Sequence, residues 1–150
     1  MKSLDDYCQE KLDAMEARKL RRTLTDTDRY APAKARRNGK DMISFSCNDY
    51  LDLSHHPDVI KAAQEAAARY GVGSGASRLV TGNTPLYSKL EAKLAKFKGT
   101  DDAIVFGSGY LTNLGAIPCL VGKDDLVIAD ELCHACLYAG AQLSRSAFKT

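Results

Sequence analysis

Apolar residues recur at helical spacing in the first part of the chain. One predicted helix covers residues 3–22, and Ser3, followed three residues later by Asp6, resembles a capping box at its start. A second covers residues 57–70, with a proline in its first turn, an alanine-rich body and Gly71 just past its end. Both segments therefore have helical periodicity and residues that suit helix ends.

The rest of the chain alternates further helices with short apolar runs of strand length. A third helix begins after Thr84 and stops at Gly99, and a last one begins near His134. Strands are predicted at residues 42–46, 103–106 and 126–129, and a further helix at residues 110–120. Such alternation favours an α/β fold with a mostly parallel sheet flanked by helices.

Residues 23–40 interrupt this pattern. They are polar, basic and aperiodic, so we expect a loop or arm. Only three strands are convincing, which is few for a parallel sheet, and Ala147 and Phe148 begin a further apolar run just before Thr150. We therefore expect a truncated domain, which is either a piece of a longer protein or a truncated gene product.

The composition is that of an ordinary globular protein. Of the 150 residues, 45% are hydrophobic and 27% are charged. The formal net charge of +2 is too small to indicate nucleic acid as a partner, and no apolar run approaches membrane-spanning length. The N-terminus lacks the apolar core of a signal peptide, and the five cysteines are irregularly spaced. We therefore expect a cytoplasmic protein with reduced thiols.

A glycine loop follows the predicted strand at residues 103–106. In Gly107-Ser108-Gly109-Tyr110 the small residues let the backbone approach a ligand closely, and the helix that follows offers free N–H groups. An anionic group, most often phosphate, suits this place, and a tight turn without a ligand is an equal alternative. A dinucleotide site is a further alternative because Asp130 follows at a suitable distance, but Thr112 replaces the third glycine.

His134 follows the end of a predicted strand and begins a helix. A lone histidine at such a position is most often a capping or partly buried structural residue, but its flat imidazole also suits the face of a cofactor ring. Cys133 and Cys136 make a C-x-x-C pair around it, for which zinc binding and redox chemistry are minor alternatives. No second ligand pair with zinc spacing follows, so we expect no metal site.

Four blocks of sequence stand in a specific order. They are residues 45–57, residues 71–83, Leu90-Glu91, and the pair formed by residues 103–110 and 126–135. Together they resemble the α-oxoamine synthases, which are pyridoxal-phosphate enzymes of the aminotransferase fold type I. The resemblance is strongest over residues 43–148. It implies an N-terminal helix and arm at residues 1–42, and the first, incomplete part of the pyridoxal-phosphate-binding large domain at residues 43–150.

The resemblance implies a cofactor, pyridoxal 5′-phosphate, and the residues that bind it. The phosphate would lie on the backbone of Gly109 and Tyr110. The imidazole of His134 would stack on the pyridine ring and would also lie near the substrate. Asn48 matches a family position near the substrate. Arg21 resembles the arginine that binds the acyl substrate, since a guanidinium suits a carboxylate or a phosphate, and a solvated helix face is the alternative.

The implied activity is a pyridoxal-phosphate-dependent acyltransferase reaction. An amino acid, alanine in the nearest relatives, condenses with an acyl thioester of coenzyme A or of an acyl carrier protein, and carbon dioxide is lost. The resemblance also implies a homodimer with active sites at the subunit interface. The Schiff-base lysine is expected beyond residue 150. We therefore expect no catalytic residue in this segment and no activity from the chain alone.

Some residues depart from the family pattern. Asp52 replaces a usual glycine, Thr84 and Tyr87 stand where relatives often carry histidines, and Cys133 and Cys136 stand where serine is more common. These departures leave the acyl substrate open, so glycine C-acetyltransferase, 5-aminolevulinate synthase and serine-palmitoyltransferase-like activities remain alternatives. A non-catalytic fragment and a nucleotide-binding module are further alternatives.

Overall fold

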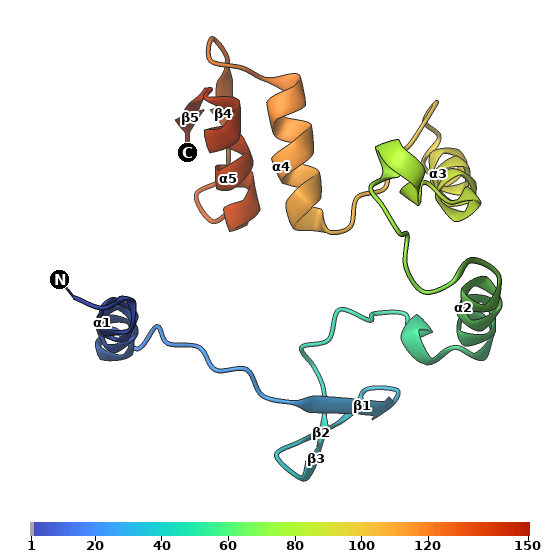
Figure 1. Cartoon of the computed structure of the whole chain (residues 1–150), viewed down its shortest axis with the longest axis horizontal. Helices are drawn as coiled ribbons and strands as arrows, with labels where there is room; N and C mark the ends of the chain where they lie inside the picture. The colour runs from blue at the N-terminus through green and yellow to red at the C-terminus, as the bar shows by residue number, and fades with distance from the viewer. Residues whose placement is uncertain (1) are drawn as a thin grey trace. The chain divides into compact units, whose positions relative to one another are not determined.

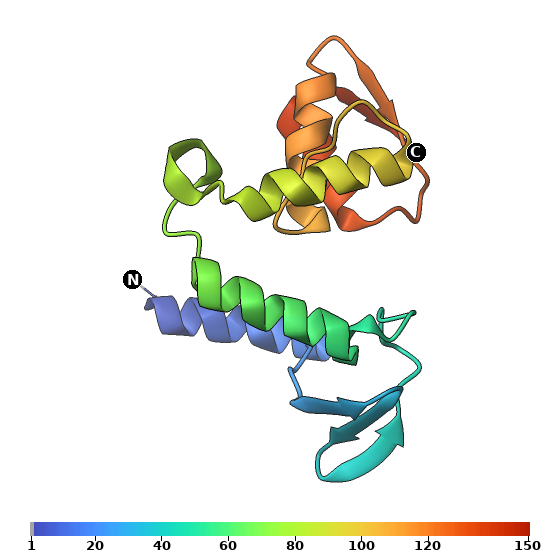
Figure 2. The same ribbon diagram turned by 90° about the vertical axis from the view of Figure 1, so that its right-hand side faces the viewer.

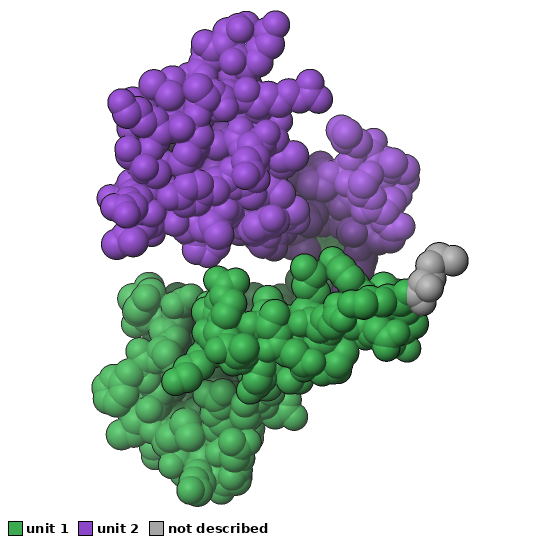
Figure 3. Space-filling view, turned by 90° about the vertical axis from the view of Figure 1, so that its left-hand side faces the viewer, with its two compact units in different colours: residues 1–71 green, residues 72–150 purple. Residues whose placement is uncertain are grey.

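The structure is a computed structural model that describes residues 2–150. It divides into two compact units, residues 1–71 and residues 72–150, which Figure 3 shows in separate colours. The order of the helices and strands can be followed by label and colour in Figure 1. The units divide directly after Gly71. The separation of an N-terminal arm from a large domain at residue 42 stays a prediction.

Helix α1 (Leu4–Ala17) opens unit 1 and has the predicted capping box. The Ser3 hydroxyl accepts a hydrogen bond from the Asp6 N–H, and the Asp6 carboxylate accepts one from the Ser3 N–H, both at 3.1 Å. The helix is shorter than the predicted 3–22. It ends early because Lys19 has a φ of 54°, which is left-handed backbone that an α-helix cannot continue.

A three-stranded antiparallel sheet follows α1, so the loop predicted at residues 23–40 is wrong. Strand β1 (Thr27–Ala31) pairs with β2 (Lys34–Arg37), and β2 pairs with β3 (Lys40–Ile43), as Figure 2 shows at the base of the ribbon. Strand β3 also lies earlier than the strand predicted at residues 42–46. The described residues of this sheet include a single buried one, Ala35, so no apolar alternation marks the strands.

The turn between β2 and β3 carries the signal that identifies this hairpin. Asn38 and Gly39 both have positive φ, at 51° and 73°. Two consecutive residues of this kind form the tight turn whose twist matches that of paired strands, and Asn-Gly is its preferred sequence. The hairpin therefore depends on its turn more than on a hydrophobic face.

Helix α2 (Pro57–Tyr70) coincides with the helix predicted at residues 57–70. The His56 imidazole caps its first turn, and Gly71, with a φ of 77°, ends it. A short 3₁₀ turn, η1 (Leu53–His55), precedes the helix. Asp52, at the start of that turn, has a φ of 52°, in the left-handed region that favours glycine. This backbone conformation explains why glycine suits the position.

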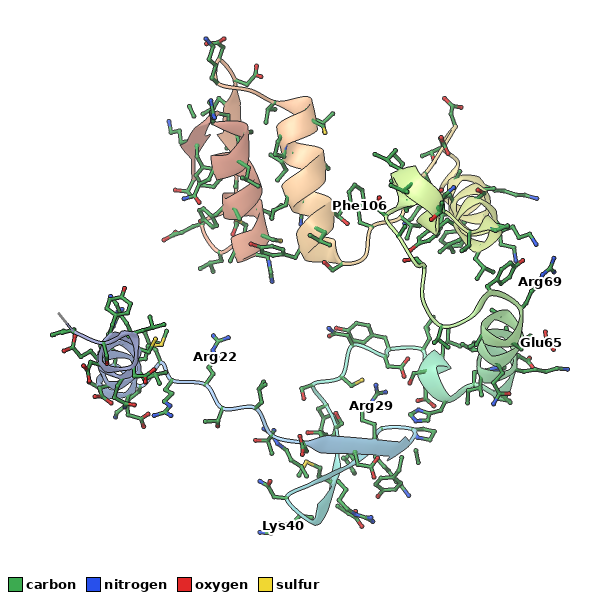
Figure 4. All side chains as sticks on the ribbon, in the orientation of Figure 1. Arg22, Arg29, Lys40, Glu65, Arg69 and Phe106 are labelled. Atoms are coloured by element: carbon green, nitrogen blue, oxygen red, sulfur yellow. The ribbon has the colours of Figure 1, made fainter. Side chains whose placement is uncertain are left out.

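The carboxylate of Asp49 joins β1 to the turn before α2. It accepts a hydrogen bond from the Arg29 guanidinium at 2.8 Å, one from the Leu53 N–H at 3.0 Å and one from the Ser54 hydroxyl. Figure 4 labels Arg29 on β1. The Ser54 hydrogen bond, followed by the Arg29 one, lowers the pKa of Asp49 from 3.8 to about 2. Asp49 is therefore ionised, and it holds two segments together.

We expect acid to release this contact. Because the folded-state pKa of Asp49, about 2, lies below its ordinary value of 3.8, the ionised carboxylate stabilises unit 1 fully above that ordinary value. The stabilisation is lost as the pH falls through about 2. The measurement is the hydrogen-exchange protection of the Leu53 N–H along an acid titration. Asp49→Asn should abolish the acid-dependent loss, and Asp26→Asn, on an exposed carboxylate, should retain it. An unchanged titration in Asp49→Asn would contradict the assignment.

Unit 2 begins with a π-helical turn, η2 (Arg78–Gly82), and helix α3 (Pro85–Lys98). The helix starts at Pro85 and ends before Gly99, which has a φ of 69°, as the sequence predicts. The side chain of Thr84 makes no capping hydrogen bond with any described residue. The start of α3 thus depends on its proline rather than on a side-chain cap.

The strand predicted at residues 103–106 is wrong, because within residues 2–150 this segment pairs with no other strand. The Val105 N–H donates to the Glu91 carboxylate at 2.8 Å, and the Val105 carbonyl accepts from the Arg78 guanidinium at 3.1 Å. Two side chains therefore satisfy the backbone groups that a neighbouring strand would otherwise pair.

The remainder of unit 2 forms a β–α–β arrangement against one more helix. Its elements are α4 (Gly109–Leu120), β4 (Leu126–Ile128), α5 (Ala135–Ser144) and β5 (Ala147–Lys149). Strands β4 and β5 are parallel, with Val127 opposite Phe148, and α5 is the connection between them. This pair is the part of the predicted parallel sheet that the described residues contain.

Helices α4 and α5 pack side by side (Figure 1). The buried residues of α5 recur along one face and are Cys136, Gly140, Ala141 and Ser144. A Cβ added to Gly140 would lie 2.6 Å from the Asn113 carbonyl oxygen and 2.8 Å from the Cδ1 of Ile117. The two helices therefore approach this closely because Gly140 has no side chain.

Candidate active site

The N-terminus of α4 carries free backbone donors. Ser108 is the N-cap, and its hydroxyl accepts a hydrogen bond from the Leu111 N–H at 3.2 Å. Gly109 and Tyr110 form the start of the first turn, where no helix carbonyl lies four residues earlier to accept from their N–H groups. Both residues are exposed. These two amides are therefore available to an anionic group.

Thr112 bears on two interpretations of the glycine loop, a phosphate site and a dinucleotide site. Its N–H and its hydroxyl both donate to the Ser108 carbonyl at 3.0 Å, so the residue lies inside the helix. The third glycine of a dinucleotide fingerprint serves close packing between helix and strand. Thr112 carries a side chain where that packing needs glycine, which favours a simple phosphate-binding helix start.

His134 is the N-cap of α5 and remains exposed. Its Nδ1 accepts a hydrogen bond from the Cys136 N–H at 3.2 Å and lies 2.9 Å from the Cys136 sulfur. The capping role predicted as one alternative for this histidine is thus present in the structure. Capping uses only Nδ1, so the ring faces and Nε2 remain available to a ligand.

The predicted cofactor residues of unit 2 lie at one end of the α4–α5 pair. Both helices start at the same end in Figure 1, which is the end where β4 leads into α5. The Asn113 side-chain amide, one turn into α4, donates to the Cys136 sulfur at the start of α5 at 3.0 Å. The amides of Gly109 and Tyr110 and the imidazole of His134 are therefore presented from adjacent helix starts.

An ion pair that the sequence analysis missed supports this end of unit 2. The Arg78 guanidinium binds both oxygens of the Glu91 carboxylate, at 2.7 and 2.9 Å. Arg78 also donates to Asn83 at 2.8 Å and lies over the Tyr87 ring. The hydrogen bond from Arg78, followed by the one from Val105, lowers the pKa of Glu91. The pair holds the segment that leads into the glycine loop.

Phe106 continues that segment toward α4. Figure 4 labels its side chain at the start of the connection into this helix. A Cβ added to Gly115 would lie 2.9 Å from the Cε1 of Phe106, so the ring packs on α4 where a glycine leaves room. Glu91 and Phe106 thus fix the glycine loop from its N-terminal side.

Arg21 and Asn48 belong to unit 1. The Arg21 guanidinium makes an exposed ion pair with Glu16 at 3.3 Å and lines a hollow of about 770 Å³ at the end of α1. Asn48 is exposed and precedes Asp49 in the turn described above. Their predicted contacts with substrate stay predictions, and so do the roles predicted for Gly109, Tyr110 and His134.

Two observations concern metals and membranes. One oxygen or nitrogen atom from each of Asp49, Asp52 and His55 lies within 4.8 Å of the others, but the Asp49 carboxylate already binds Arg29 and Ser54. In the described part of the chain no helix combines the length and the apolar character needed to cross a bilayer.

Comparison with known families decides what kind of protein carries this arrangement. Residues 40–150 match the family Aminotransferase class I and II. The chain belongs to this family. The match includes the glycine loop, His134 and the Arg78–Glu91 pair. It argues against a dinucleotide-binding module.

The chain is similar to curated members of the family from bacteria. It is 59% identical over 144 residues to the 8-amino-7-oxononanoate synthase of Methylobacterium radiotolerans and 58% identical over 144 residues to that of Methylorubrum extorquens. Each match covers 96% of this chain and 38% of the relative. The chain thus spans little more than a third of the length of these relatives.

A solved structure shows the same fold. Serine palmitoyltransferase from S. paucimobilis, with a bound PLP–myriocin aldimine, matches with a TM-score of 0.84 and 31% identity. The match covers 99% of this chain and 38% of that protein. The predicted α/β fold class, part of an aminotransferase-type large domain, is confirmed. The resemblance to the α-oxoamine synthases, in which the sequence blocks point to 8-amino-7-oxononanoate synthase, is confirmed as well.

Proposed function

We propose that this chain is the N-terminal part of a pyridoxal-phosphate-dependent acyltransferase. The reaction is the condensation of an amino acid, alanine, with an acyl thioester of coenzyme A or an acyl carrier protein, with decarboxylation. The activity proposed is that of 8-amino-7-oxononanoate synthase. An identity of 58–59% over nearly the whole chain supports it above a serine-palmitoyltransferase-like activity, for which the solved structure has 31% identity.

The observation that carries the proposal is the shared start of α4 and α5. The N–H groups of Gly109 and Tyr110 suit a phosphate group, because helix starts bind anions through unpaired amides. The exposed His134 ring, held at Nδ1, suits a flat heterocycle beside that phosphate. When bound, pyridoxal phosphate supplies an electron sink for the carbanion of the amino acid. The donor set at this end of unit 2 fits that cofactor.

The remaining parts of the proposal concern substrates and the rest of the protein. Arg21 would bind an anionic group of the acyl substrate, and Asn48 would lie near the reacting groups. The Schiff-base lysine would come from sequence beyond residue 150, so the 150-residue chain would bind cofactor without turnover. The whole protein would act as a homodimer.

The test is binding of pyridoxine 5′-phosphate, which has no aldehyde and so forms no Schiff base with surface lysines. We expect amide NMR shifts at Gly109 and Tyr110 and ring shifts at His134, and none of the amide shifts with pyridoxine. Gly109→Pro should weaken binding roughly tenfold, because proline is tolerated at the first helical position but removes the N–H that binds the charged phosphate.

The control for Gly109→Pro is its far-UV circular dichroism spectrum, which should match that of the wild type. Ser108 already has extended backbone, the conformation that a following proline favours. NAD should produce no shifts at these amides. Shifts from NAD but not from pyridoxine phosphate, or equal binding of pyridoxine and its phosphate, would contradict the proposal.

A further inference from the structure

The thiol of Cys136 lies buried between the two helix starts. The residue is 4% exposed, and its sulfur is 2.9 Å from His134 Nδ1 and 3.0 Å from the Asn113 side-chain nitrogen. Cys136 thus contacts the residue proposed to cover the cofactor ring and, through Asn113, the helix proposed to bind its phosphate. Among the described cysteines, Cys136 is the one hydrogen-bonded to both His134 and α4.

The hydrogen bond from the Cys136 N–H selects one tautomer of the neutral imidazole. The Cys136 N–H donates to Nδ1, so Nδ1 must carry a lone pair rather than a proton. The Cys136 N–H and the thiol proton then share the one lone pair of Nδ1, and the sulfur accepts from the Asn113 amide. The neutral ring therefore carries its proton on Nε2, the nitrogen that remains exposed.

We propose that Cys136 is a positioning residue for His134. Its backbone N–H sets the tautomer, and its thiol holds the imidazole in one rotamer, with a free face and an Nε2–H presented at the common start of α4 and α5. The assignment of the free face to a pyridine ring rests on the proposed function. The role of the thiol in positioning the imidazole is independent of that function.

The geometry assigns this function to the thiol rather than to packing alone. A methyl group at the Cys136 position would fill space at the helix contact, but it would neither donate to Nδ1 nor accept from Asn113. A hydroxyl would do both. Alanine and serine variants therefore separate packing from hydrogen bonding at the same site.

The experiment uses the ring nitrogens of the 150-residue chain. The chain has three histidines, so the ¹⁵N ring signals of His134 can be assigned by their loss in His134→Asn. In the wild type we expect the Nε2–H tautomer and side-chain couplings of a single χ1 rotamer. Cys136→Ala should give rotamer-averaged couplings, and Cys136→Ser should restore the wild-type values. Cys119→Ala, on an exposed thiol of α4, should change neither.

A binding measurement separates this proposal from the proposed function. Cys136→Ala should weaken pyridoxine 5′-phosphate several-fold, with recovery in Cys136→Ser. If His134 becomes mobile in Cys136→Ala while no variant binds the probe, the positioning stands and the cofactor proposal fails. If Cys136→Ala keeps a single rotamer at His134, or if Cys136→Ser fails to restore it, the positioning proposal is overturned.

Discussion

Replacing Gly140 with alanine is expected to separate α4 from α5 and to destabilise unit 2. The new Cβ would lie 2.6 Å from the Asn113 carbonyl oxygen and 2.8 Å from Ile117, so one helix must shift. Overpacking of this kind costs about 1–3 kcal/mol. In a domain of this size the midpoint of thermal unfolding should fall by roughly 5–15 °C. The measurement is thermal unfolding followed by far-UV circular dichroism.

The matched control for this substitution is Gly122→Ala. Gly122 has nothing within 4 Å of an added Cβ, so its variant should unfold near the wild-type temperature. Alanine is a better helix former than glycine by about 1 kcal/mol, so an uncrowded Gly140 would give a more stable variant. A rise in the unfolding temperature of Gly140→Ala would therefore contradict the close helix contact.

Replacing Glu91 with glutamine is expected to loosen the segment that enters the glycine loop. The carboxylate accepts two hydrogen bonds from Arg78 and one from the Val105 N–H, and its side chain is only 13% exposed. The variant keeps the size but loses the charge, which leaves the Arg78 guanidinium without its counter-charge. Hydrogen exchange of the Val105 N–H should accelerate by roughly tenfold, the scale of one lost charge-assisted hydrogen bond.

An exposed ion pair of the same chain serves as the comparison. Arg36 and Asp41 lie 2.8 Å apart across β2 and β3, with side chains 52% and 59% exposed. Such surface pairs contribute little, so Asp41→Asn should change the stability far less than Glu91→Gln. If the two variants lower the unfolding temperature equally, the Arg78–Glu91 pair does not have the structural importance assigned to it.

Helix ends were predictable from sequence where the end signals are local. Pro57 and Gly71 bound α2 as predicted, because proline suits a first turn and glycine tolerates the left-handed backbone that follows a helix. The same reasoning missed the hairpin of β2 and β3. Its strands carry lysine and arginine instead of an apolar face, and the informative signal was the Asn38-Gly39 turn.

The candidate site was also predictable from the sequence only in part. The free amides of Gly109 and Tyr110 follow from a small-residue loop before a helix, which sequence patterns reveal. The partners of Glu91 do not, because Arg78 and Val105 lie 13 and 14 residues away on separate segments. The Cys136 contact was also out of reach, since the C-x-x-C spacing directs attention to the other cysteine rather than to the imidazole between them.

The common start of α4 and α5 has an electrostatic consequence. Each helix macrodipole is equivalent to about half a positive charge at its N-terminus. The two parallel neighbours together therefore place about one positive charge at their common start, without any lysine or arginine. The field of this charge belongs to the backbone and does not titrate. The attraction for a bound anion should therefore weaken with ionic strength, while substitution of any single side chain leaves its source in place.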